Sequence, residues 1–266
     1  MYHTKYGLDF NPFIKNSEDI LIETTENKEI VYRLKYLLDT KGFGVITGAS
    51  GRGKTTAVRH WANNLSTSLY KVIYLPLSTV TVMEFYRQLA ESLGLEARFR
   101  KSENFKMIQT EINRLTLEKR ITPVIIGDEA NYYKSGILND LKMLFSFEKD
   151  SKDRAVVLLV GLPQLNNTLR LTSNESLRQR IVMNYHLDQL SKEEGHDYIR
   201  AILKAARCTQ TVFEEAAIEA ILNTANGIIR MINKICDVCL LIGDSRGEPI
   251  ITTEIVRSAV NEIELD

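Results

Sequence analysis

Several features of exported, membrane-spanning or fibrous proteins are scarce or missing in the 266-residue sequence. Cysteine occurs only three times, an odd number in a chain long enough to fold without disulfides, so we expect a reducing compartment, the cytosol. No run approaches about 18 consecutive apolar residues, and the start lacks a basic segment followed by an apolar one. We therefore expect neither a membrane span nor a signal peptide. The 5 prolines and 14 glycines are too few for a collagen-like or disordered chain.

The sequence also has no surplus of charge of either sign, with 34 basic and 34 acidic side chains. The surface as a whole is therefore not basic enough to attract nucleic acid, and any DNA binding must be confined to a local basic patch. At about 150 residues per domain, the length allows one large domain or a medium and a small one.

Apolar, β-branched runs recur along the first part of the chain and predict a parallel α/β sheet. The first four runs are almost continuously apolar, as expected for strands covered on both faces, and longer helical stretches separate the strands. The five runs are 42–48, 71–77, 122–126, 155–160 and 181–187.

The chain changes character after Leu190, where strand signals stop and helical signals begin. Ser191 and Glu194 have capping-box spacing, and apolar residues then recur at helical spacing. We therefore predict an α/β domain over 1–190 and a small all-helical domain over 191–266.

The first predicted strand leads into a glycine-rich segment that matches the phosphate-loop pattern. Its glycines let backbone N–H groups turn inward around a phosphate, and the helix predicted over 56–65 adds partial positive charge at its N-terminus. Lys54 would reach the β and γ phosphates of ATP, and the Thr55 hydroxyl would bind Mg²⁺. The alternative is a glycine-rich turn without a ligand. The predicted nucleotide-binding residues here are Gly48, Ala49, Ser50, Gly51, Arg52, Gly53, Lys54, Thr55 and Thr56.

Two acids, Asp128 and Glu129, follow the third predicted strand, at the edge of the sheet where open α/β folds bind ligands. Asp128 suits a position behind the direct ligands of the metal, and Glu129 suits a base that orients and polarises an attacking water. Acids also end strands for structural reasons alone, but beside a phosphate loop the pair favours ATP hydrolysis over phosphoryl transfer to a small molecule.

The order of six motifs resembles the AAA+ ATPases of the ExeA and TnsC type, which are related to the transposon ATPases MuB and IstB. This resemblance covers nearly the whole chain. It implies a P-loop NTPase (AAA+) fold with a five-stranded parallel sheet in the order 5-1-4-3-2, a helical lid, and ATP held between them. The motifs are Tyr6-Gly7-Leu8 with Asn11-Pro12-Phe13, Gly48 to Thr56, Asp128-Glu129-Ala130, Val160 to Leu165, Leu177 to Arg180, and Gly227 to Asn233.

The resemblance also implies roles for three arginines and for the start of the chain. Arg230 matches the lid arginine that touches the γ-phosphate, and Arg178 and Arg180 match the region of the finger that reaches the ATP of a neighbouring subunit, with Arg180 favoured. For each arginine the alternative is a surface salt bridge worth under about 1 kcal/mol. The residues that match an adenine-contacting segment, with packing alone as the alternative, are Asn11, Pro12 and Phe13.

Three residues depart from the pattern of these ATPases. Gly127 stands where a bulky aliphatic is usual and should weaken its strand locally. Ile229 replaces a usual proline next to Arg230, and Leu162 sits near the position of a polar sensor but cannot form a side-chain hydrogen bond. We therefore expect slow hydrolysis that suits a switch better than a fast motor.

A basic segment with two aromatics lies between the second predicted strand and the acid-bearing strand. The resemblance implies that this region tracks the phosphates of double-stranded DNA inside a homo-oligomeric ring or helical filament, and such contacts are sequence-independent and salt-sensitive. One subunit offers few contacts, so tight binding would require assembly. The alternative is a solvated loop. The candidate DNA-binding residues are Arg98, Arg100, Lys101 and Lys106.

Cys236 and Cys239 have metal-type spacing, but they lie in an apolar helical run without a second pair, so we expect core packing. Trp61 should pack the helix after the phosphate loop against the sheet. As a whole, the sequence favours an ATP-dependent, DNA-binding regulator that selects target DNA and recruits a transposase. Two alternatives are a secretion or envelope-assembly ATPase of the ExeA kind acting on protein partners, and a nucleotide-driven signalling switch without DNA.

Overall fold

The protein is described by a computed structural model, which covers residues 2–15, 22, 24–148 and 151–263. Contacts divide the chain into two compact units. A sheet unit comprises Glu26–Ser50 and Lys54–Leu187, and a helical unit comprises Met1–Thr25, Gly51–Gly53 and Asp188–Asp266. The sequence placed the N-terminal segment in an α/β domain over 1–190, whereas this segment groups with the helical unit, whose main part begins at Asp188.

Within the described residues, five parallel strands form one sheet in the order β2-β3-β4-β1-β5, which is the predicted order read from the other edge. Strands β1, β3 and β4 are buried almost throughout because helices cover both faces, which explains their continuous apolar character. The strands are β1 (Gly42–Gly48), β2 (Tyr70–Leu75), β3 (Thr122–Gly127), β4 (Val156–Gly161) and β5 (Ile181–Leu187). The parallel α/β prediction is confirmed.

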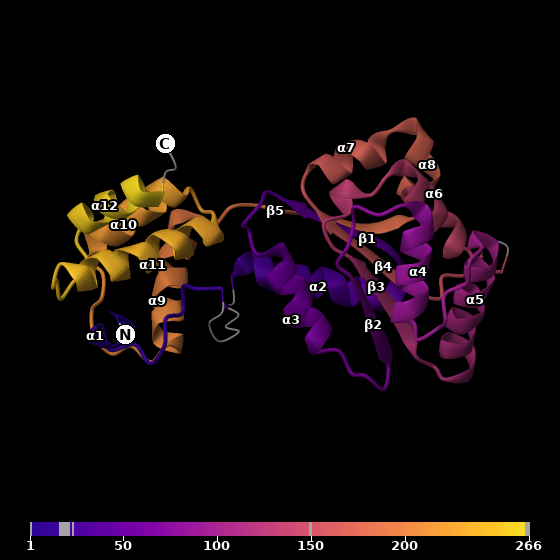
Figure 1. Cartoon of the computed structure of the whole chain (residues 1–266), viewed down its shortest axis with the longest axis horizontal. Coiled ribbons are helices and arrows are strands. Elements are labelled where there is room, and N and C mark those ends of the chain that lie inside the picture. Colours follow the sequence, from indigo (N-terminus) through magenta and orange to yellow (C-terminus); the bar gives the residue numbers. More distant parts are fainter. Residues whose placement is uncertain (1, 16–21, 23, 149–150, 264–266) are drawn as a thin grey trace. The chain divides into compact units, whose positions relative to one another are not determined.

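Alternate residues of the central strands β1, β3 and β4 enter two separate cores on the two faces of the sheet. Helices α2 and α3 lie on one side of the sheet and α4, α5 and α6 on the other (Figure 1). Val45 of β1 joins the core formed with α4, α5 and α6, whereas the next residue, Ile46, joins the core formed with α2 and α3. Trp61 is buried in the second core, as predicted. The helices are α2 (Thr25–Thr40), α3 (Lys54–Asn63), α4 (Val82–Ser92), α5 (Lys101–Asn113), α6 (Ser135–Leu144), α7 (Gln164–Arg170) and α8 (Glu175–Arg178), with short π or 3-10 turns at Arg114–Glu118, Ala130–Tyr132 and Thr172–Asn174.

The helical unit packs its helices around a core of its own. Ser191 and Glu194 form the predicted capping box, in which the Glu194 N–H donates to the Ser191 hydroxyl at 3.1 Å and the Ser191 N–H donates to the Glu194 carboxylate at 3.1 Å. Cys236 and Cys239 are fully buried in this core, as predicted. The helices are α1 (Tyr2–Lys5), α9 (Lys192–Ala205), α10 (Glu215–Ala225), α11 (Ile229–Ser245) and α12 (Thr253–Ile263).

The N-terminal segment is held in the helical unit by polar and aromatic contacts. The Asn11 side-chain amide donates to the Asp237 carboxylate on α11 at 2.6 Å, while its carbonyl oxygen accepts from the Phe13 N–H at 3.0 Å. Phe13 is buried and packs edge-to-face on Phe213. These contacts account for the grouping of the segment with the helices. In the described part of the chain no helix is long and apolar enough to cross a membrane.

Candidate nucleotide and metal site

The predicted phosphate loop leaves the end of β1 and enters α3, which begins at Lys54, two residues earlier than predicted. The Lys54 ammonium is buried and donates to the carbonyl oxygens of Gly48 and Ala49, both at 2.9 Å. A Cβ at Gly48 would lie 3.0 Å from the Leu187 carbonyl oxygen, so this position tolerates little more than glycine. The loop therefore places a cationic side chain across backbone groups at the carboxyl edge of the sheet.

The loop contains two glycines in the left-handed region, Gly51 with φ 79° and Gly53 with φ 88°, where side chains are strained. The segment Gly51–Gly53 groups with the helical unit, in which the Arg230 N–H donates to the Gly51 carbonyl at 3.0 Å. A Cβ at Gly51 would lie 2.9 Å from the Arg230 Cβ. Position 51 therefore requires glycine for two reasons, the left-handed backbone conformation and the close approach of Arg230.

Asp128 is the most heavily hydrogen-bonded acid of the site. One carboxylate oxygen accepts from the Thr55 hydroxyl at 2.9 Å and also from the Tyr74 hydroxyl, and the other accepts from the Glu129 N–H at 2.9 Å. The Ser78 hydroxyl donates to the Asp128 backbone carbonyl at 2.8 Å. These contacts bring together the predicted metal-binding pair, Thr55 and Asp128.

The direction of the Thr55 hydrogen bond matters for the chemistry. Because the hydroxyl donates its proton to Asp128, the oxygen lone pairs stay available for a cation. Mg²⁺ prefers oxygen ligands and often binds through one or two protein groups together with phosphate oxygens and water. The residues present therefore fit a magnesium–nucleotide complex, with Thr55 as a ligand and Asp128 behind it.

Glu129 has an exposed side chain and an unusual backbone, with φ 51° and ψ 36°. Left-handed conformations are uncommon for residues other than glycine and concentrate at functional sites. The hydrogen bond from its N–H to Asp128 stabilises this conformation and begins the turn Ala130–Tyr132. The predicted base is therefore held at a sharp bend with its carboxylate open to solvent.

The departure at Gly127 has a packing explanation. A Cβ at this position would lie 2.8 Å from the Tyr133 hydroxyl and 3.0 Å from the ring. Tyr133 is buried and contacts Phe85 edge-to-face. The aromatic ring fills the space that a bulky aliphatic would take, so the strand keeps its packing.

A side chain that the sequence analysis did not single out stands next to the apolar sensor position. The side-chain amide oxygen of Asn131 accepts from the Leu162 N–H at 2.9 Å, and a Cβ on Gly161 would lie 2.8 Å from that same oxygen. Asn131 thus ties the turn after the two acids to the end of β4. Tyr74 and Ser78 were missed too, although the adjacent parallel strands β2 and β3 place their carboxyl ends at one edge.

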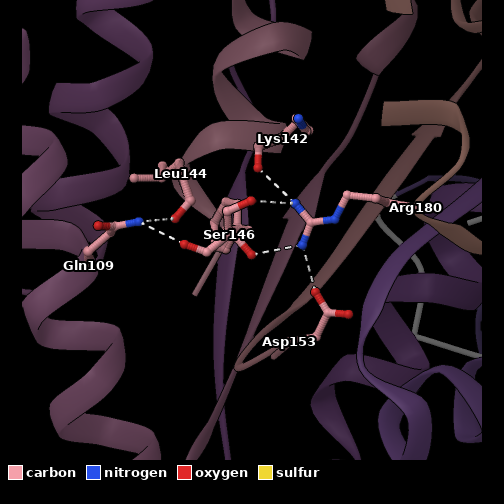
Figure 2. Close-up of polar contacts among 7 residues, drawn as sticks. Gln109, Lys142, Leu144, Ser146, Asp153 and Arg180 are labelled. Atoms are coloured by element: carbon pink, nitrogen blue, oxygen red, sulfur yellow. Dashed lines mark hydrogen bonds and ion pairs between the residues drawn. The ribbon is translucent and has the colours of Figure 1, made fainter. Parts of the chain in front are cut away.

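The structure does not favour Arg180 as a finger. Its guanidinium donates to the Lys142 carbonyl at 2.8 Å and pairs with Asp153 at 2.8 Å (Figure 2). It also donates to the Phe145 carbonyl at 3.0 Å. A fourth bond reaches the Ser146 hydroxyl at 3.2 Å. Arg180 therefore caps the C-terminus of α6 within its own subunit.

The other candidate finger, Arg178, is exposed on α8, and Arg230 is exposed near the start of α11. Their side chains are accessible, as a residue that must reach a phosphate requires.

The basic segment is more ordered than a solvated loop. The Asn104 side chain is buried, accepts from the Arg98 N–H at 2.8 Å and donates to the Arg98 carbonyl at 2.8 Å. Lys101 begins α5 and, although it is exposed, pairs with the buried Asp140 at 2.6 Å. Arg98, Arg100 and Lys106 are also exposed and remain candidates for phosphate contacts, while Lys101 has a structural partner.

Comparison with known proteins agrees with this arrangement. A family model described as an AAA domain matches residues 37–169. General secretion pathway protein A of Aeromonas hydrophila is 32% identical over 254 residues, which cover 93% of this chain but 46% of that protein. The chain therefore spans about half the length of this relative.

Two solved structures share the fold at low identity. Cdc6p of Pyrobaculum aerophilum has a TM-score of 0.73 at 17% identity, covering 95% of this chain and 70% of the other. The Aeropyrum pernix ORC1 protein in complex with DNA has a TM-score of 0.67 at 19% identity, covering 95% and 69%.

Proposed function

Since the chain belongs to the AAA domain family, we propose that it binds ATP with Mg²⁺ and hydrolyses it slowly to ADP and phosphate as a nucleotide-dependent switch. The observation that carries this proposal is the hydrogen bond from Thr55 to Asp128 beside the phosphate loop. Bound Mg²⁺ would neutralise charge on the phosphates. Lys54 would exchange its two loop carbonyls for phosphate oxygens.

In the proposed reaction Glu129 orients a water for attack on the γ-phosphorus and polarises its O–H bond. Arg230 senses the terminal phosphate, and Arg178, in place of Arg180, reaches the nucleotide of a neighbouring copy. Guanidinium groups suit both tasks because their planar fork of donors matches phosphate oxygens. The proposal therefore includes a homo-oligomer, ring or filament, that forms when ATP is bound.

Two substitutions test the site. Lys54→Ala should abolish ATP binding, whereas Glu129→Gln should retain it and slow hydrolysis by about a hundredfold or more. Glu96→Gln, at another exposed glutamate of the sheet unit, is the matched control and should leave both properties unchanged. Hydrolysis by Glu129→Gln at the parent rate would refute the assignment of the base.

For the partner, we favour a protein of a secretion or envelope-assembly apparatus. The support is the 32% identity to General secretion pathway protein A, which extends over nearly the whole of this chain. The Glu129→Gln variant, which should hold ATP, provides the test. A secretion or envelope-assembly protein captured from cells by Glu129→Gln with ATP, but not by Lys54→Ala, would support this partner. Equal capture by both would contradict it.

Double-stranded DNA is a second candidate partner, because Arg98, Arg100 and Lys106 are exposed together around the start of α5. Binding of a duplex should then require ATP, weaken with salt and increase with duplex length. The assay compares ATP with ADP at two salt concentrations, using the parent and a triple alanine variant of these residues. If the variant binds DNA with unchanged affinity, the segment has no part in DNA binding. The further prediction of a transposase partner depends on DNA binding by this protein.

A further inference from the structure

Tyr74, near the end of the edge strand β2, contacts the carboxylate of Asp128. Its hydroxyl donates to the same oxygen that accepts the Thr55 hydroxyl. The register explains this reach, since Tyr74 pairs with Ile126 in the parallel ladder, two residues before Asp128. A tyrosine hydroxyl extends beyond the end of the neighbouring strand and meets the acid there.

Packing alone does not explain why a tyrosine stands at this position. Tyr74 is 37% exposed, and Val72, on the same face of the strand, is 36% exposed. Tyr70, also on this face, packs against the core formed with α2 and α3. The polar contact to Asp128 is therefore the main interaction that distinguishes Tyr74 from its neighbours on β2.

We propose that Tyr74 is a positioning residue, an inference that rests on the proposed function. Its hydroxyl fixes the Asp128 carboxylate so that the Thr55 hydroxyl presents its lone pairs to Mg²⁺. One carboxylate oxygen is anchored by the Glu129 N–H, and the other receives donors from two different elements. Three donors leave the carboxylate plane little freedom to rotate. Without the Tyr74 hydroxyl, Thr55 would be the only side-chain donor to that oxygen among these contacts.

The Tyr74 hydroxyl donates to the carboxylate that stands directly behind Thr55, the proposed metal ligand. Groups behind a metal ligand that fix its orientation typically contribute tenfold or more to metal affinity.

The test is the Mg²⁺ dependence of nucleotide binding in Tyr74→Phe, with Tyr70→Phe as the control on the same strand and face. Binding of a fluorescent ATP analogue is titrated at increasing free Mg²⁺ and, separately, in EDTA. We expect the half-saturating Mg²⁺ concentration to rise about tenfold in Tyr74→Phe. Affinity in EDTA and the thermal midpoint should match the parent, and Tyr70→Phe should behave as the parent throughout.

The outcomes separate this inference from the proposed function. A half-saturating Mg²⁺ concentration for Tyr74→Phe within twofold of the parent would overturn the inference alone. An equal loss of affinity with and without Mg²⁺ would also overturn it, because it would indicate a structural role. If the parent binds no nucleotide at all, both the inference and the proposed function fail.

Discussion

Replacing Arg180 by alanine should destabilise the sheet unit and leave the chemistry intact. With the described residues the guanidinium makes four hydrogen bonds, three of them to groups at or just after the end of α6, and its side chain is only 15% exposed. It also lies over the Phe43 ring, 5.1 Å from the centroid. At about 1 kcal/mol for each bond, less for the half-exposed Asp153 that water can solvate, the loss is about 2–4 kcal/mol.

For a unit of this size, such a loss lowers the thermal midpoint by about 4–16 °C. The assay is thermal unfolding followed by near-ultraviolet circular dichroism, together with ATP hydrolysis measured below the lowered midpoint. Arg180→Lys should fall between parent and alanine, because an ammonium keeps the charge but cannot span the same acceptors.

Arg178→Ala is the matched control, two residues away and exposed. Its thermal midpoint should stay near that of the parent, since surface substitutions are usually within about 0.5 kcal/mol, while hydrolysis by the assembled protein falls by about 10³-fold. An Arg180→Ala protein with the parent midpoint but no hydrolysis would refute the capping role and restore Arg180 as the finger.

Two further predictions concern packing and pH. Gly127→Ala should lower the free energy of unfolding by about 1–3 kcal/mol because its Cβ would lie 2.8 Å from the Tyr133 hydroxyl. Tyr133→Phe should restore part of this loss in the double variant. If chemical denaturation shows that the two substitutions have independent, additive effects, the contact is contradicted. Hydrogen bonds from Ser191 lower the pKa of Glu194, so this carboxylate stabilises the fold above its unfolded pKa of about 4.3 and loses that contribution as the pH falls through its lower folded pKa. Glu194→Gln should therefore be less stable than the parent at pH 7 by urea unfolding and approach it at acid pH, and a gap that persists there would contradict the assignment.

The parts of the site that follow one another in the chain could be predicted from sequence. The loop from Gly48 to Thr55 and the acids after β3 are fixed by local spacing, and parallel strands bring their carboxyl ends to one edge. The order of the strands came from the family resemblance, because apolar runs reveal which segments are buried but not which strands are neighbours.

The contacts that could not be predicted from sequence join segments far apart in the chain. The apolar character of Phe13 predicts burial, yet nothing in its spacing shows that its partner is Phe213. Arg180 is a cation in a plausible place for a finger, and only the fold brings it to Phe145 and Asp153. The contact of Tyr74 with Asp128 could not be predicted from sequence for the same reason, since it depends on the register of β2 against β3.

The fit between Asn131 and Gly161 means that neither position can change freely without the other. A methyl group at 161 would occupy the place where the amide oxygen receives the Leu162 N–H. A shorter residue at 131 would relieve only part of this clash, because a Cβ at 161 would also lie 3.0 Å from the Asn131 backbone nitrogen, and it would detach the bend carrying Glu129 from the end of β4. A comparison of homologous chains would show whether positions 131 and 161 change together.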